Sequence, residues 1–170
     1  MMKATMMFMI AVLLMLAMGC SRDEPAKIVN PPVVETPTSI KMNELYAKGT
    51  AADPDWVELY NPGTSPVSLN GYKIYDQGGQ TGSKPKLEFP AEAVIPAKGY
   101  YVIVTDVDTD AGFGMSSGGE DVWLENDSSR VIDQIKFLPH ETNQTYGRYP
   151  DGDSTWQVLN TMTRGASNQQ

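Results

Sequence analysis

Few residues in this chain could attack or transfer a bond. The sequence has one histidine, His140, which follows Pro139 in a predicted loop, and one cysteine, Cys20. A serine or cysteine nucleophile needs a histidine beside it as a base, so His140 is the single candidate for that role. A lone histidine in a loop is more often an ordinary surface residue. We therefore expect no catalytic histidine.

Three carboxylates recur at alternate positions, which is how some calcium loops begin. Asp106, Asp108 and Asp110 follow a predicted strand. The helix–loop–helix calcium pattern then fails, because Ala111 stands where glycine is needed and Ser117 where the closing glutamate is needed. One hypothesis is a calcium ion held by the three aspartates and backbone oxygens. The alternative, which we favour, is a solvated acidic loop with no cofactor.

Two other kinds of site stay open. A pair of carboxylates could cleave a glycosidic bond, although the sequence singles out no pair among 21 acidic residues. Trp123 is placed by alternation on the polar side of its strand, so its ring is the best candidate for stacking on a glycan. The alternative is that the aromatic side chains cover the edges of the fold and keep only their polar tips in water.

The cysteine follows a segment that resembles an export signal. Residues 4–18 are apolar apart from Thr5, and as a helix they would cover only about 22 Å of a roughly 30 Å hydrocarbon layer. That length is typical of a secretory signal rather than a membrane span. Residues 16–20 (Leu-Ala-Met-Gly-Cys) resemble the lipobox of bacterial lipoproteins. The resemblance implies cleavage between Gly19 and Cys20, and fatty acyl chains (palmitate among them) on Cys20 that anchor the protein to membrane lipid.

The residues after Cys20 predict an extended linker and a location in the cell envelope. Ser21 resembles the outer-membrane sorting residue of Gram-negative lipoproteins, and the acidic pair Asp23 and Glu24 resembles a surface-export tag. Four prolines between residues 25 and 38 then indicate an extended, semi-stiff spacer. We therefore expect a lipid-anchored protein of the cell envelope, in the outer membrane. The acidic pair favours display on the outer surface, and the sequence leaves the face of the membrane open.

The charge of the chain argues against one class of partner. The net charge is −8, and without the first nineteen residues, which carry only Lys3, 12 basic and 21 acidic side chains leave −9. A nucleic-acid phosphate backbone would be repelled by such a body unless a basic stripe were present, and no run of Lys or Arg forms one. We expect no nucleic-acid partner.

From residue 39 onward, short alternating segments separated by turn residues predict an all-β fold. Residues 55–63 form the central strand and the turn that closes it, with Val57 and Leu59 on the inner face. Residues 40–46 alternate but slip phase between Met42 and Leu45, as a β-bulge would cause. Seven or more such strands are typical of a β-sandwich.

Several blocks, in a fixed order, resemble the lamin tail domain, an immunoglobulin-like β-sandwich. The blocks are residues 40–45 (IKMNEL), 55–61 (DWVELYN), 67–72 (VSLNGY), 89–90 (FP), 95–100 (IPAKGY), 115–124 (MSSGGEDVWL), 131–133 (VID), 146–152 (YGRYPDG) and 165–168 (GASN). Together with the lipobox-like segment, this resemblance predicts three regions: a lipoprotein signal peptide (1–19), a lipidated cysteine with a Pro-rich linker (20–38), and a lamin-tail-like β-sandwich (39–168). The lamin tail resemblance itself covers only the third region. It implies no catalytic residues, and it implies a binding or tethering role toward a protein or glycan. A glycan-binding surface lipoprotein using aromatics and calcium, or a carboxylate-based hydrolase, are the alternatives.

Overall fold

The alternating segments form strands in the computed structural model, which describes residues 40–170. These residues lie within one compact unit, Glu35–Gln170. In chain order the described elements are β1 (Lys41–Tyr46), β2 (Trp56–Tyr60), β3 (Val67–Ser68), β4 (Lys73–Tyr75), α1 (Gln77–Thr81), β5 (Leu87–Glu88), β6 (Val94–Ile95), β7 (Tyr100–Val104), β8 (Asp121–Glu125), β9 (Val131–Lys136), β10 (Thr145–Arg148) and β11 (Trp156–Leu159). The prediction of an all-β, immunoglobulin-like sandwich is confirmed.

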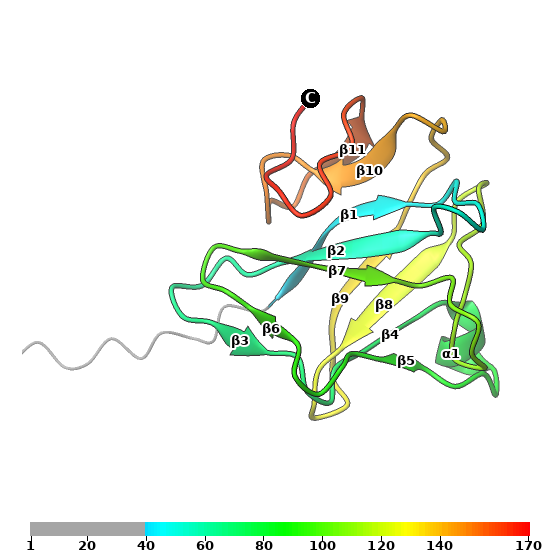
Figure 1. Ribbon diagram of the computed structural model, residues 1–170, viewed down its shortest axis with the longest axis vertical. Helices are drawn as coiled ribbons and strands as arrows, with labels where there is room; N and C mark the ends of the chain where they lie inside the picture. Colours follow the sequence, from blue (N-terminus) through cyan, green and yellow to red (C-terminus); the bar gives the residue numbers. More distant parts are fainter. Residues whose placement is uncertain (1–39) are drawn as a thin grey trace, which may run out of the picture. The chain divides into compact units, whose positions relative to one another are not determined.

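Two main antiparallel sheets face each other (Figure 1). The larger sheet has the strand order β11-β10-β1-β2-β7, and the smaller has the order β5-β4-β8-β9. A third, two-stranded ribbon pairs β3 with β6. The family-like blocks from both ends of the described chain meet in the larger sheet, because β1 pairs with β2 on one side and with β10 on the other.

The core fills the space between the two sheets with the inward members of each alternating pattern. Leu59 and Val57 of β2 and Val122 and Leu124 of β8 are fully buried, as their period-two spacing predicts. Burying a Leu or Val side chain in this way contributes roughly 1.5–3 kcal/mol each, which makes this layer the main source of stability.

The predicted bulge in β1 is present. Met42 pairs with Leu59 and Leu45 pairs with Val57, and the register shifts between Met42 and Glu44. A bulge adds one residue to one strand, so two residues on β1 lie opposite one on β2. The extra residue lets Met42 and Leu45 both enter the core while Asn43 and Glu44 make their hydrogen bonds at the opposite face.

A short helix lies in the glycine-rich stretch that the sequence predicted to be loop. Asp76 caps α1, because its side chain accepts a hydrogen bond from the backbone N–H of Gly79 at 3.2 Å. Gly79 lies directly against Tyr75, so close that a Cβ on it would be 2.6 Å from the Tyr75 Cβ. In residues 40–170 no helix is long and apolar enough to cross a membrane.

After β11 the chain turns back across the larger sheet. We call residues 160–170 the strap. Thr163, Gly165 and Asn168 of the strap hydrogen-bond to residues of β1, β2 and β10 on the side that faces away from the core. The strap therefore covers a sheet face that would otherwise meet water.

Candidate functional site

The lipidation prediction falls outside the described residues. Gly19 and Cys20, with the signal peptide and the tether, precede residue 40. The acyl anchor on Cys20 stays a prediction.

The structure does not bring the three alternating aspartates together. Asp106, Asp108 and Asp110 are all exposed in the loop after β7. Backbone hydrogen bonds within the loop, such as that from the N–H of Phe113 to the carbonyl of Thr105 at 2.7 Å, hold its shape. Among residues 40–170 no group of three His, Cys, Asp or Glu side chains is arranged to hold a metal ion. The loop is exposed and acidic, and calcium binding to it stays an untested hypothesis.

The expectation that Trp123 faces solvent is wrong. Its side chain is only 7% exposed, and its ring stacks on that of Tyr75 with centroids 6.1 Å apart and planes 9° apart. Alternation placed Trp123 correctly on the outer face of β8. A strand pattern cannot show that α1, which begins two residues beyond Tyr75, packs against β4 and β8.

His140 has a structural role in the loop before β10. It is 4% exposed, and its Nε2 accepts a hydrogen bond from the backbone N–H of Ala47 at 3.1 Å. Burial lowers the pKa of its imidazole below the ordinary value, which keeps the ring neutral and able to accept. Among residues 40–170 the rings beside it are those of Tyr46 and Phe137, and its Nδ1 lies 3.4 Å from the carbonyl oxygen of Leu138.

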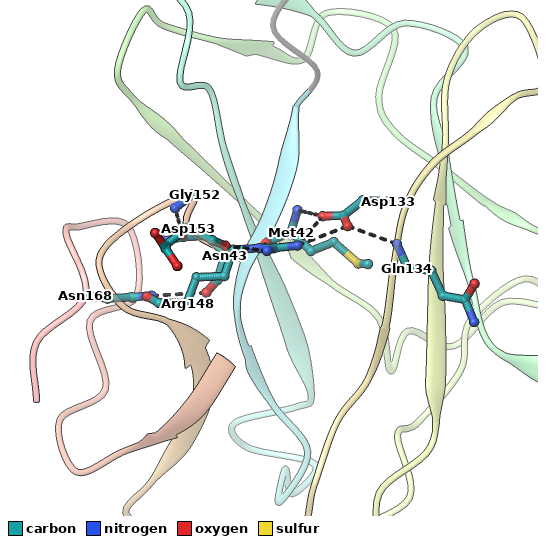
Figure 2. Close-up of polar contacts among 8 residues, drawn as sticks. All are labelled: Met42, Asn43, Asp133, Gln134, Arg148, Gly152, Asp153 and Asn168. Carbon is teal, nitrogen blue, oxygen red and sulfur yellow. Dashed lines mark hydrogen bonds and ion pairs between the residues drawn. The ribbon is translucent and has the colours of Figure 1, made fainter. Parts of the chain in front are cut away.

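The main concentration of polar side chains is a buried cluster beside the bulge of β1. One part of it, which we call the inner half, consists of Arg148 and Asp133 and links the two sheets (Figure 2). Arg148 of β10 binds both carboxylate oxygens of Asp133 of β9 at 3.0 Å, and Asp133 also accepts a hydrogen bond from the backbone N–H of Met42 at 2.9 Å. The guanidinium further donates to the carbonyls of Met42 and Asp153.

The outer half of the cluster lies beneath the strap. Asn43 donates to Glu58 at 3.1 Å and to Asp151 at 3.0 Å, and it accepts from the N–H of Gly152 at 3.0 Å. Asn168 of the strap donates to the carbonyls of Asn43 and Arg148. These bonds join the strap, the β10–β11 turn and β1 into one network (Figure 2).

Two carboxyls stand in register on the neighbouring strands of this outer half. Glu44 and Glu58 are Cα partners across β1 and β2, and both are 0% exposed. Glu44 accepts from the Thr145 hydroxyl at 2.5 Å and from the Thr163 N–H at 3.1 Å, and Glu58 accepts from the Gly165 N–H at 2.6 Å. Burial raises the pKa of both groups, that of Glu58 to about 7.

The other acidic member keeps its charge. Burial would raise the pKa of Asp151, but hydrogen bonds from Asn43, Ser167 and Tyr100 outweigh that effect and hold it below its ordinary value. The Tyr100 hydroxyl donates to Asp151 at 2.6 Å. Burial and this bond together raise the pKa of Tyr100.

Little in the pattern of residues along the chain predicts this cluster. Arg148 binds Asp133 across the two sheets, whereas Glu58 receives hydrogen bonds from Asn43 and Gly165. The sequence predicted only the bulge, and in the structure this bulge places the consecutive polar residues Asn43 and Glu44 beside the cluster.

A carboxylate pair on adjacent strands raises the question of hydrolysis, and the geometry argues against it. Both groups are enclosed by protein and are already occupied by protein donors. Within residues 40–170 every fully buried side-chain nitrogen or oxygen has a hydrogen-bond partner. A substrate would have to displace the strap before touching either carboxyl.

Comparison with known proteins gives the family. No curated protein matches the sequence. The model of the lamin tail domain matches residues 34–138, which extends from ahead of β1 to the end of β9. This match spans more than half of the chain and agrees with the observed sandwich. The chain therefore belongs to the lamin tail domain family, a family of non-catalytic, immunoglobulin-like domains.

Proposed function

We propose that this protein is a non-catalytic binding module of the cell envelope, anchored by lipid on Cys20, whose β-sandwich presents a surface to a partner. The observation that carries the proposal is the polar cluster itself. The described side chains best suited to chemistry (Glu44, Glu58 and His140) are buried and engaged in the fold. Recognition by the outer surface is the function left to such a domain.

The exposed apolar side chains favour a protein partner over a glycan. Of the large hydrophobic residues exposed in the described chain, only Tyr149 is aromatic. The others are Val94, Val131, Leu138, Val158 and Met162. Sugar rings pack on flat aromatic faces, whereas aliphatic and methionine side chains pack against other side chains. The net charge of −8 further favours a partner with a basic or neutral surface.

The anchor is tested by replacing Cys20 with alanine in the full chain. We expect the wild-type protein in the membrane fraction and in the detergent phase of a Triton X-114 partition. Its amino-terminal peptide should have the mass of an acylated cysteine. Cys20→Ala should leave both fractions, whereas the control Ser21→Ala should keep the acyl mass. A wild-type peptide with an unmodified Cys20 thiol would overturn the anchor.

The binding role is tested separately. A glycan array with the purified protein, read with and without calcium, should show no specific spot if the partner is a protein. Specific glycan binding would instead support the glycan alternative. Turnover of a glycoside substrate that is lost in Glu58→Gln would overturn the non-catalytic proposal.

A further inference from the structure

The strap closes over two acidic groups, neither of which forms a salt bridge within residues 40–170. Glu44 and Glu58 lie on adjacent strands and are fully buried. Within residues 40–170 their hydrogen-bond partners are the side chains of Thr145, Thr163 and Asn43 and the backbone N–H groups of Thr163 and Gly165. Two buried carboxylates one strand apart cannot both ionise without a large cost.

The hydrogen bonds of Thr163 show where a proton is needed. Its hydroxyl lies 3.0 Å from Glu44 Oε2 and 2.9 Å from Asn168 Oδ1. Asn168 is oriented by its amide nitrogen, which donates to the carbonyls of Asn43 and Arg148, so the atom facing Thr163 is the acceptor oxygen. One hydroxyl has one proton and cannot donate to both acceptors. Both contacts are satisfied when Glu44 is protonated and donates to Thr163, which then donates to Asn168.

We propose that the strap is a proton-dependent latch, which closes over the Glu44–Glu58 pair with a proton bound there and loosens as rising pH ionises the pair. The latch goes beyond the proposed binding function and does not depend on the anchor. When the latch is open, it uncovers Trp56, which is 2% exposed and lies under the Arg164 guanidinium of the strap at 5.4 Å. It also uncovers Glu44 and Glu58. The sheet face beneath the strap is therefore covered in the closed state and exposed and acidic in the open state.

The charged and titratable groups around the pair support this direction. β1 contributes Glu44 itself, the β10–β11 turn contributes Asp151, and β7 contributes Tyr100, whose hydroxyl is engaged by Asp151. The strap contributes Arg164, but this guanidinium pairs with Asp53 at 3.4 Å on the exposed rim. The negative charge of Asp151 adds to burial in disfavouring the ionised form of both members of the pair, and ionisation of either member disfavours that of the other.

The sign of the pH dependence follows from proton uptake. Burial raises the pKa of Glu58 from 4.5 to about 7 in the closed state. The closed state therefore binds more protons than the open state between these values. The equilibrium constant for closing the strap is therefore largest below pH 4.5. It falls by about tenfold per pH unit up to about pH 7 and is constant above that.

The test is hydrogen exchange of the strap in the full chain, held in detergent, from pH 5 to pH 8. The N–H groups of Thr163 and Gly165 donate to the two carboxyls, so their protection reports closure. After correction for the intrinsic pH dependence of exchange, we expect their protection to fall by more than tenfold across this range, while that of β8 stays constant. Constant protection of the strap would overturn the proposal.

In Glu44→Gln a neutral amide with a permanent N–H donor replaces the protonated carboxyl. The new amide nitrogen can donate to the Thr163 hydroxyl while the amide oxygen accepts from Thr145, so we expect more strap protection at pH 8 than in the wild type. Glu120→Gln is the matched control, because Glu120 is also a carboxyl whose pKa is raised by burial but is bonded to the Ser116 N–H, away from the strap. Protection in Glu44→Gln no higher than in the wild type would contradict the latch. If Glu44→Gln does not fold, a carbon-13 titration of the wild-type carboxyls decides, since ordinary midpoints near ~4.3 for both would overturn it.

Discussion

The link between Arg148 and Asp133 is the residue-scale feature on which the two sheets depend. Both side chains are less than a tenth exposed, and they connect β10 of one sheet with β9 of the other. Asp133→Ala would leave a buried guanidinium and the Met42 N–H without their acceptor. We expect the free energy of unfolding, measured with urea, to fall by about 3–5 kcal/mol.

The control for this prediction is another Arg–Asp pair of the same chain. Arg164 and Asp53 are 42% and 58% exposed. Exposed pairs contribute about 0–1 kcal/mol, so Asp53→Ala should be nearly silent. Equal losses in the two variants would show that the buried pair has no special part in joining the sheets.

His140 should contribute a pH dependence opposite in sign to that of the latch. The pKa of its buried ring is below the ordinary value of 6.5, so its contribution is present above 6.5 and is lost as pH falls. His140→Gln keeps an acceptor for Ala47 but cannot be protonated. We expect it to be about 1–3 kcal/mol less stable at pH 7 and to show a shallower loss of stability in acid. An unchanged acid slope in urea unfolding would contradict this.

The residue contacts of the cluster could not be predicted because their partners are far apart in the sequence. Glu44 and Thr163 are separated by 119 positions, and Asn43 and Asn168 by 125. Alternation reports which face of a strand a side chain occupies, not which distant segment will cover that face. From alternation alone, Glu44 and Glu58 would be interpreted as ordinary exposed carboxylates. Only the structure shows that the strap buries them.

At the scale of elements, hydrophobic periodicity predicted the strands correctly, but it did not predict the helix α1, which packs against the outside of a sheet. The bulge of β1 and the inward residues of β2 were predicted from the spacing of apolar residues, and all are present. The helix α1 was not, because its sequence Gln-Gly-Gly-Gln-Thr carries neither an apolar stripe nor good helix formers. Its capping residue, Asp76, was the only local signal.

The close approach of α1 to Tyr75 can be tested with one methyl group. In Gly79→Ala the new Cβ would lie 2.6 Å from the Tyr75 Cβ, so the helix must move away from the sheet. We expect Trp123 to become accessible, which acrylamide quenching of tryptophan fluorescence would detect. Gly78→Ala is the control, because its Cβ meets Asp76 Oδ1 at 3.1 Å and the flexible Lys84 side chain at 3.3 Å. Equal quenching in Gly79→Ala and the wild type would contradict the cover.

At the scale of the whole molecule, the fold extends beyond the residues that the family model matches. The match ends at residue 138, whereas β10 supplies the second neighbour of β1 and the strap covers Glu44 and Glu58. In a chain that stops after Leu138, β1 would pair only with β2 and would be an exposed edge strand of the larger sheet. We expect it to be unfolded or aggregated by circular dichroism and size-exclusion chromatography.

A chain that stops after Leu159 gives the matched comparison. It keeps β10 and β11 and loses only the strap. We expect it to retain its β-sheet signal while unfolding at lower urea than the full chain, because Trp56 and two carboxyls lose their cover. A stable, cooperatively folded chain ending at residue 138 would contradict this division.

The position of β1 decides how the domain would respond to mechanical load. β1 is the first described strand, yet it lies inside the sheet, hydrogen-bonded to β10 on one side and to β2 on the other. A pull on the chain ahead of Ile40 would therefore strain two ladders and the Met42–Asp133 bond at the same time. An edge strand would instead be peeled away one bond at a time. A domain held by its amino-terminal end against fluid drag would gain tensile strength from this placement.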